Sequence, residues 1–219
     1  MQILQSLVIT VFALFVVLTL QMAAQERDIR GRLFPPENLG LLETPDRDVW
    51  QKPDEIMDAL GIVNGAVVAD VGAGGGWFTV RLARRVGPTG IVYAEDIQPR
   101  MIDAIELRVI REGLGNVRTT LGTPGDPKLP VGALNAVIIV DTYHEIEDPV
   151  TLLLNVTQAL KPNGLVGIVD YKTDGGGPGP PIEERVDSAV ILRDAETAGL
   201  QLLRRENFLT YQYLLVLSK

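Results

Sequence analysis

Short strand-like segments that alternate with helix-like segments constrain this chain more than any other feature of its sequence. Five such strand-like segments, most of them apolar throughout, cover residues 67–71, 90–97, 117–121, 136–140 and 165–170. Helices are predicted over residues 53–60, 77–86, 99–114 and 149–160. A strand that is apolar throughout is covered on both faces, as in a parallel sheet with crossover helices. The pattern therefore predicts a doubly wound α/β fold.

The carboxyl-terminal part of the chain departs from this alternation. A predicted helix over residues 183–198 ends at Gly199, and two strand-like segments follow at 201–207 and 211–217. The link between these two segments is too short for a parallel crossover, so they must be antiparallel neighbours. The sheet is thus predicted to be mostly parallel, with an antiparallel pair at its end.

The amino-terminal segment, residues 1–24, contains no charged side chain and is almost wholly apolar. Its length fits both an export signal and a membrane anchor. The small residues at its end are typical of a signal-peptide cleavage site near Ala24. A signal peptide usually begins with Lys or Arg, however, and this segment contains neither. We therefore expect a protein that is exported to a periplasm or held at a membrane through this segment. Residues 25–53 are predicted as a linker or lid, and residues 54–219 as a single domain.

The charge of the chain and the residues that it lacks exclude several classes of function. The 219 residues include 20 Lys and Arg against 28 Asp and Glu, a net charge of −8, whereas binding to a phosphate backbone depends on clustered cations. Cysteine is absent and His144 is the single histidine, so disulfides, thiolate metal sites and multi-histidine zinc sites are excluded. We expect no nucleic-acid partner and no bound metal.

A glycine-rich turn follows the first strand of the predicted domain. Asp70 lies near the end of that strand, and the turn contains Gly72, Gly74 and Gly76. Ligands bind at the carboxyl ends of strands in open α/β sheets, where such glycines allow close approach and the next helix presents N–H groups. A dinucleotide fingerprint would need glycine in place of Trp77, and Asp70 disfavours a pyrophosphate. We predict a ligand that carries an amine, which Asp70 would bind, and a carboxylate, which the N–H groups would bind. The alternative is that the glycines serve only the packing of the turn.

Two acids, Glu95 and Asp96, close the second strand of the predicted domain. An acid there can accept both hydroxyls of a ribose, and Asp96 follows Gly72 at nearly the spacing of nucleoside-binding units, roughly 20 residues. Because successive strand residues face opposite sides, we expect only one acid to project into the crevice, and we choose Asp96. The alternative is that either acid caps the following helix.

Together with two later motifs, these features resemble the class I S-adenosylmethionine-dependent methyltransferases. The motifs are Asp-Thr-Tyr-His-Glu at 141–145, after the fourth strand, and Leu-Lys-Pro-Asn-Gly at 160–164, before the fifth. The resemblance covers residues 54–219 and implies seven strands, the last antiparallel, and S-adenosylmethionine as the cofactor. An Arg-Asp-x-Trp-Gln-Lys-Pro segment at 47–53 also resembles a bacterial subgroup of exported or membrane-attached members.

The resemblance implies a part of the cofactor for each motif residue. It places Asp70, Gly72, Gly74 and Gly76 at the methionine portion. It places Asp96 at the ribose, and Gly122 and Thr123 at the adenine. The family often has an acid at the position of Thr123, so this residue is a departure, and Asp126 is a candidate substitute. Asn135 stands where an Asp commonly opens the fourth strand, and we expect it to have a structural role.

The residues after the fourth strand lie where the resemblance places the methyl acceptor. We predict His144, Asp141 and Tyr143 as the catalytic candidates, with Tyr143 serving either as catalyst or as pocket wall. A histidine has an unperturbed pKa near 6.5, so His144 could remove a proton from a hydroxyl, an amine or an acidic carbon. The equal alternative is that His144 only shapes the pocket, with Asp141 or Glu145 fixing its tautomer. The Gly/Pro-rich run at 175–181 is predicted to be a mobile rim of this crevice.

The sequence leaves three functions open. The first is a methyltransferase that uses S-adenosylmethionine on a small or membrane-associated acceptor, with catalysis mostly by positioning. The second is a methyltransferase-like domain of the cell envelope that binds a ligand or partner without catalysis, because the methyl donor is a cytosolic metabolite. The third, a nicotinamide-dependent oxidoreductase, is disfavoured by Trp77 and by the antiparallel edge pair.

Overall fold

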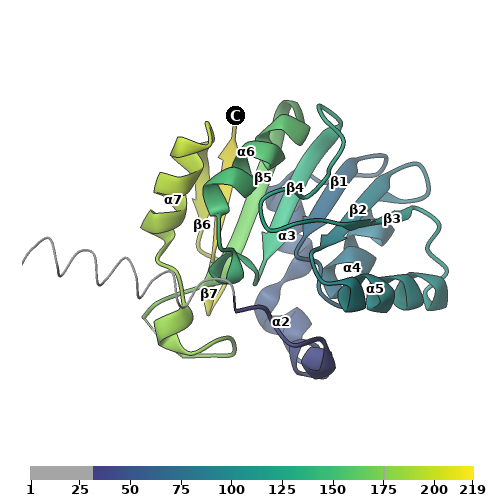
Figure 1. Cartoon of the computed structure of the whole chain (residues 1–219), viewed down its shortest axis with the longest axis horizontal. Coiled ribbons are helices and arrows are strands. Elements are labelled where there is room, and N and C mark those ends of the chain that lie inside the picture. The colour runs from purple at the N-terminus through teal and green to yellow at the C-terminus, as the bar shows by residue number, and fades with distance from the viewer. Residues whose placement is uncertain (1–31, 175) are drawn as a thin grey trace, which may run out of the picture.

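The computed structural model describes residues 32–174 and 176–219, which form a seven-stranded sheet between two layers of helices (Figure 1). The strands are β1 (Val67–Val71), β2 (Ile91–Asp96), β3 (Val117–Leu121), β4 (Leu134–Val140), β5 (Leu160–Tyr171), β6 (Gln201–Glu206) and β7 (Gln212–Ser218). Their order is β3-β2-β1-β4-β5-β7-β6, in which β7 is antiparallel to β5 and β6 and the other neighbours are parallel. The predicted doubly wound sheet with an antiparallel last strand is confirmed.

Helices cover both faces of the sheet because consecutive residues of its central strands point to opposite sides. Val68 belongs to the buried cluster that includes α3 and α4, whereas Ala69 and Val71 belong to the cluster that includes α6 and α7. The helices are η1 (Pro36–Leu42), α2 (Arg47–Gln51), α3 (Pro53–Ala59), α4 (Trp77–Val86), α5 (Pro99–Arg111), η2 (Tyr143–Glu145), α6 (Pro149–Ala159), η3 (Ile182–Glu184) and α7 (Ser188–Thr197). Burial on both faces explains why the central strands are apolar throughout.

Two elements differ most in extent from the sequence-based predictions. Strand β5 begins earlier than predicted, because Leu160 pairs with Leu134 across a register shift in the ladder. The single helix predicted over 183–198 is divided into η3 and α7. The division has a local cause, since the Asp187 side chain accepts a hydrogen bond from Ala189 N (2.7 Å) and caps a new helix at that point.

The segment before the first strand packs on the domain. We call residues 32–52 the strap; it contains η1 and α2, where a linker or lid without helical periodicity is predicted. Arg47 and Gln51 of α2 are buried, and Lys52, with φ of 48°, turns the chain from α2 into α3. The strap lies against the carboxyl ends of the parallel strands (Figure 1).

The predicted export signal or anchor, residues 1–24, lies outside the described residues. Within the described ranges, no helix is both long enough and apolar enough to cross a membrane.

Candidate active site

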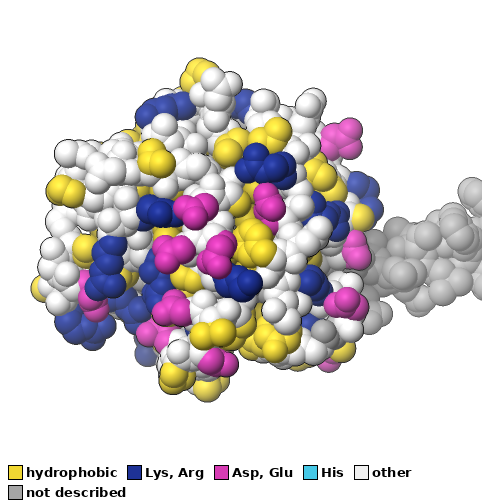
Figure 2. Space-filling view, turned by 180° about the vertical axis from the view of Figure 1, so that it is seen from behind, with side chains coloured by type: hydrophobic (Ala, Val, Ile, Leu, Met, Phe, Trp, Pro, Cys, Tyr) yellow, Lys and Arg dark blue, Asp and Glu magenta, His cyan; other side chains and the backbone are white. Residues whose placement is uncertain are grey.

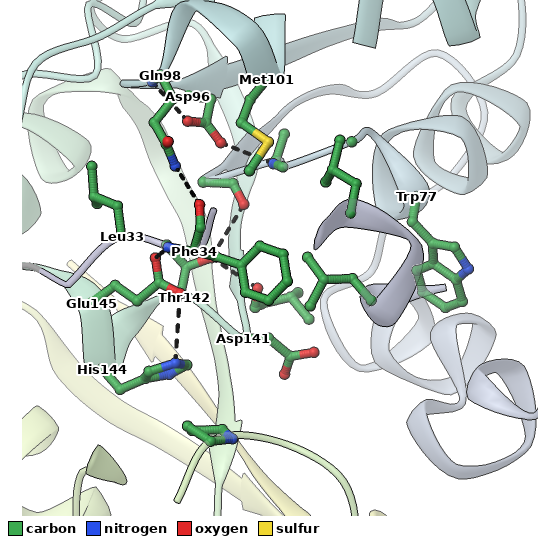
Figure 3. A pocket seen from close by; sticks show the side chains of 18 of the residues that line it. Leu33, Phe34, Trp77, Asp96, Gln98, Met101, Asp141, Thr142, His144 and Glu145 are labelled. Atoms are coloured by element: carbon green, nitrogen blue, oxygen red, sulfur yellow. Dashed lines mark hydrogen bonds and ion pairs between the residues drawn. The ribbon is translucent and has the colours of Figure 1, made fainter. Parts of the chain in front are cut away.

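A pocket of about 630 Å³ opens where the carboxyl ends of β1, β2 and β4 meet the strap (Figure 3). Its polar side is formed by residues at the strand ends: Asp70, Gly72, Gly74, Glu95, Asp96, Asp141, Thr142, His144 and Glu145. Its apolar side is formed mainly by the strap and the helices: Leu33, Phe34, Leu39, Leu41, Leu42, Trp50, Phe78, Met101, Ile146 and Leu152. The structure thus brings most of the predicted site residues to one place.

The glycine-rich turn after β1 forms the floor of this pocket, and two of its glycines are required for different reasons. Gly72 and Gly74 have φ values of 69° and 54°, a region that side-chain-bearing residues rarely adopt. A Cβ at Gly72 would collide with the Thr142 side chain, so glycine allows this turn to approach the loop after β4. A Cβ at Gly74 would meet nothing, because this position faces the open pocket. Gly76 caps the amino terminus of α4.

Asp70 lies beneath this turn and is 2% exposed. One of its carboxylate oxygens accepts a hydrogen bond from Thr79 Oγ1 at 2.6 Å. Burial raises the pKa of Asp70 to about 6, against the lowering influence of Thr79 and Arg47. A buried carboxyl of this kind favours a nearby cation, which stabilises its ionised form. The position therefore suits the predicted amine.

Both acids that end β2 line the pocket, so the prediction that only one of them can do so is wrong. Asp96 accepts hydrogen bonds from Gly74 N and Gln98 N, each at 2.9 Å, and Glu95 accepts one from Gly72 N at 3.4 Å. The strand ends here, and side chains on both of its faces reach the same edge. Neither acid caps α5, whose cap position is Gln98. Burial raises the pKa of both acids, that of Glu95 to about 8.

The loop after β3 contributes less than predicted. Thr123 lines the pocket, and Gly122 lies buried beside it. Asp126, the candidate substitute for the adenine contact, is exposed, is not among the lining residues and accepts a hydrogen bond from a backbone N–H of its own loop (2.8 Å). Asn135 accepts hydrogen bonds from the β1 backbone (3.0 Å) and from Lys161 Nζ (2.9 Å), which is the structural role predicted for it.

His144 and Asp170 form a buried pair beside the pocket. His144 Nδ1 lies 3.0 Å from Asp170 Oδ1, and the His144 backbone N–H donates to Asp170 Oδ2, also at 3.0 Å. His144 Nε2 lies 3.8 Å from Glu145 Oε1. Burial by itself lowers the pKa of His144, but the carboxylates of Asp170, Glu145 and Asp141 together outweigh it and raise the pKa to about 9. His144 is therefore protonated at neutral pH, and Asp170 fixes its orientation.

Tyr143 does not belong to the site, and the prediction that places it there is wrong. Its side chain is fully buried in the cluster on the α6 and α7 side, and its hydroxyl donates to Asp194 Oδ2 of α7 at 2.9 Å. The turn η2 directs successive residues to different sides. Tyr143 consequently faces the core, while His144 faces the pocket.

Asp141 is held by residues from both ends of the described chain. Arg47 Nη2 and Gln51 Nε2, both on α2, each lie 3.0 Å from Asp141 Oδ2, and Gln212 Nε2 of β7 donates to Oδ1. Asp141 also has a positive φ of 56°, a conformation that persists only where neighbours enforce it. Its carboxylate therefore fastens the strap over the pocket. Arg47 and Gln51 both belong to the Arg-Asp-x-Trp-Gln-Lys-Pro segment, but no sequence pattern marks either of them as a partner of Asp141.

Phe34 of the strap crosses the pocket. Its backbone N–H donates to Glu145 Oε2 at 3.0 Å, and its carbonyl accepts from Gln98 Nε2 at 3.1 Å. Figure 3 shows these two hydrogen bonds spanning from the loop after β2 to the loop after β4. Nothing in the sequence marks Phe34 as a contact residue, because the strap carries no periodic pattern.

The Gly/Pro-rich loop over the site is anchored by one side chain. Arg185 donates from its guanidinium to the carbonyls of Pro180 (3.0 Å), Lys172 (3.0 Å), Gly176 (3.2 Å) and Pro178 (3.2 Å). Its guanidinium also lies 5.3 Å from the centre of the Tyr171 ring. The described part of this predicted mobile rim is thus tied to the end of β5 by a network of hydrogen bonds.

The strand order, the glycine turn after β1 and the acids at the end of β2 define the class I methyltransferase fold. Residues 68–164 match a family of proteins described as a methyltransferase domain. The chain is 28% identical to a SAM dependent methyltransferase from Aquifex aeolicus, whose crystal structure matches with a TM-score of 0.81 over 84% of this chain and 98% of that one. A putative type 11 methyltransferase from Sulfolobus solfataricus shares the fold, with a TM-score of 0.61 and 24% identity over 76% of this chain and 91% of that one.

Curated relatives point to the same domain. The chain is 30% identical to nocamycin O-methyltransferase from Saccharothrix syringae over 126 aligned residues. The alignment covers 58% of this chain and 42% of that protein. It is 29% identical to demethylmenaquinone methyltransferase from Geobacillus stearothermophilus over 116 aligned residues. That alignment covers 53% of this chain and 49% of that protein. The alignments thus span less than half the length of either relative. The predicted methyltransferase fold is confirmed, and the similarity of residues 68–164 to a methyltransferase domain and of most of the chain to a SAM dependent methyltransferase supports S-adenosylmethionine as the cofactor.

Proposed function

We propose that this chain is an S-adenosylmethionine-dependent methyltransferase that acts on a small or membrane-associated acceptor with an apolar body. The observation that carries the proposal is a single pocket in which the predicted donor residues face an apolar wall. A donor on the polar side would meet an acceptor held against side chains such as Leu41, Trp50 and Phe78. Transfer is an in-line displacement, so holding the two molecules in this relation supplies most of the catalysis.

The charge of the pocket fits this cofactor. Asp70, Glu95 and Asp96 line one side of it, and burial raises the pKa of all three. Buried carboxyls in this state favour a cationic ligand, and S-adenosylmethionine carries a sulfonium and an amine. Asp70 would hold the amine, N–H groups at the amino terminus of α4 would hold the carboxylate, and Asp96 would hold the ribose. The activated methyl group on the sulfonium is the chemistry that the cofactor supplies.

His144 is the residue that we expect to act on the acceptor. Asp170 occupies its Nδ1, which leaves Nε2 for an acceptor oxygen. Because the ring is protonated at neutral pH, it would donate a charge-assisted hydrogen bond to an acceptor oxygen that is already ionised, such as a phenolate. Substituting His144 by Gln should then slow transfer by about 10²–10³-fold, the usual loss for one donor to an oxyanion, while donor affinity stays near wild type. A pocket-shaping role alone predicts a small loss.

Compartment and partners form the second part of the proposal. We propose that residues 1–24 export the protein or anchor it, so that the acceptor is a molecule of the cell envelope. Nucleic acid is not expected, because the chain carries a net charge of −8. On the face shown in Figure 2, basic side chains lie among acidic ones. Elsewhere in the described domain, ion pairs such as that of Arg84 with Glu112 (2.7 Å) neutralise basic side chains.

The proposal is tested by binding and transfer on the full-length chain. Calorimetry with S-adenosylmethionine and its demethylated product should show binding, and methyl-labelled donor should label a member of a panel of apolar phenols, quinols and amines. A reporter fused to the carboxyl terminus determines on which side of the membrane the domain lies. No binding at millimolar ligand would overturn the proposal, and binding of NADH instead would favour the oxidoreductase. Donor binding without any transfer would favour the non-catalytic envelope domain.

A further inference from the structure

Apolar side chains are exposed around the mouth of the pocket. Leu33 and Leu41 of the strap line the pocket, yet they are 42% and 71% exposed. Val49, 76% exposed, immediately precedes a lining residue of α2. Ile182, 55% exposed, immediately follows the lining prolines of the Gly/Pro-rich loop. We call Leu33, Leu41, Val49 and Ile182 the mouth face; exposed apolar side chains that gather in this way mark an interaction site.

Helix η1, which contributes Leu41 to the mouth face, is apolar without being covered. Four of its seven residues are apolar, namely Pro36, Leu39, Leu41 and Leu42, and none of the seven is buried. Figure 2 shows hydrophobic side chains at the lower edge of the molecule, which is where the strap lies in Figure 1. Apolar surface that faces water costs free energy, and covering it recovers that free energy. The mouth face therefore suits an apolar partner.

Charged side chains of the strap are paired with charges on neighbouring elements. Three ion pairs join the strap to the domain: Arg32 with Glu184 (3.7 Å), Glu37 with Arg100 (3.3 Å) and Asp48 with Arg81 (2.5 Å). The first pair brings the start of the strap next to η3, so it holds Leu33 near Ile182. Paired charges leave a weak net field at this surface, and a charged partner depends on such a field for recognition. The mouth face therefore favours an uncharged, apolar surface.

We infer that the mouth face docks on one leaflet of a lipid bilayer and inserts its apolar side chains among the lipids. The inference rests on the proposed function, in which residues 1–24 anchor the protein or export it to the cell envelope. Residues 25–31 alone separate that uncharged, almost wholly apolar segment from the strap. Trp50 and Tyr211, whose ring centres lie 6.4 Å apart, belong to the residue types that concentrate at membrane–water interfaces. A second copy of the chain on this face would close the pocket, whereas a fluid bilayer leaves its mouth open to an acceptor that diffuses in the lipid.

Lipid quenching of a single fluorescent label tests this docking on the full-length chain in phosphatidylcholine vesicles. The chain contains no cysteine, so Val49→Cys and Val131→Cys each provide one site for the label. Val131 is the matched control, because it is 77% exposed and precedes β4 at the opposite edge of the sheet. Nitroxide-labelled lipid should remove most of the fluorescence at residue 49 and leave that at residue 131 unchanged. Salt at about 1 M should not restore the fluorescence, because screening acts on charges and not on apolar contacts.

A pair of charge substitutions, each combined with the label at residue 49, tests the face itself. Ile182→Glu should reduce the quenching, because docking would bring a carboxylate among the lipids. Leu203→Glu, at a position of β6 that is 51% exposed, should leave the quenching unchanged. Equal effects of the two substitutions, equal quenching at residues 49 and 131, recovery of the fluorescence in salt, or a chain that does not bind the vesicles would overturn the docking.

Two further readouts separate the docking from its alternatives. Blue-shifted emission at residue 49 without quenching would overturn the docking in favour of a second copy of the chain on this face. Calorimetry with S-adenosylmethionine on the same vesicles tests the proposed function independently. Donor binding without quenching would overturn the docking and leave the methyltransferase standing, and quenching without donor binding would overturn the methyltransferase and leave the docking standing.

Discussion

Replacing Arg47 with Ala tests whether Asp141 fastens the strap. The Arg47 and Asp141 side chains are 9% and 11% exposed, so the variant leaves a carboxylate buried without its counter-ion. Breaking such a pair by removing one partner costs roughly 3–5 kcal/mol. Gln51 and Gln212 still donate to Asp141, which places the expected loss in the free energy of unfolding at about 3 kcal/mol near pH 8.

The loss should depend on pH in a defined direction. Burial raises the pKa of Asp141, and Arg47 opposes this rise, so the variant has a higher folded-state pKa than the wild type. A carboxyl with a raised folded-state pKa contributes stability that is present at low pH and is lost as the pH rises above its unfolded value. The difference between Arg47→Ala and the wild type should therefore grow from about pH 4 to neutral pH.

Urea unfolding followed by circular dichroism at pH 4.5 and 8 measures both quantities. The matched control is Arg84→Ala, which breaks an exposed ion pair with Glu112 and should change stability by no more than about 0.5 kcal/mol. An Arg47→Ala variant within that margin of the wild type at pH 8 would refute the argument. A loss that is larger at pH 4.5 than at pH 8 would refute its electrostatic part.

Three further substitutions test the donor side and the buried histidine. Asp96→Ala should weaken binding of S-adenosylmethionine by about 1.5–3 kcal/mol, measured by calorimetry, because it removes the acceptor proposed for the ribose. Gly74→Val should abolish donor binding while the circular dichroism stays native, since the added side chain enters open pocket at φ of 54°; an unfolded variant would contradict this prediction. His144 has a folded-state pKa of about 9, so its contribution to stability is present below its unfolded value near 6.5 and is lost as the pH rises through 9. His144→Gln should remove that loss in urea unfolding between pH 6 and 9, and a variant whose stability falls as steeply as that of the wild type would contradict the pairing with Asp170.

The parts of the fold that follow from local pattern were predictable from the sequence, and the parts that depend on distant contacts were not. Strand β1 and helix α4 have the predicted bounds, because apolar runs and flanking glycines determine them. The strap has no such pattern. Arg47 is 94 residues from Asp141 in the sequence, so a contact between them is visible only after the sheet has formed.

The candidate site shows the same division. Asp70, Gly72 and Asp96 were placed correctly in one pocket, because each follows a strand whose carboxyl end lies at the same edge. Tyr143 was misplaced, since a single short helical turn decides which of two adjacent residues faces the core. The position of Glu95 depends on the missing side chain at Gly122, a contact between neighbouring strands that spacing along the chain does not reveal.

The docking of the strap across the pocket sets a length for any tether at the amino terminus. The first described residue, Arg32, lies in the wall of the pocket and follows residue 24 by a short stretch of chain. Eight residues, even fully extended, span at most about 29 Å, which is close to the thickness of the hydrocarbon layer of one bilayer. If residues 1–24 stay in a membrane, the mouth of the pocket is kept within that radius of the lipid surface. A water-insoluble acceptor would then travel no farther than one bilayer thickness to reach the methyl donor.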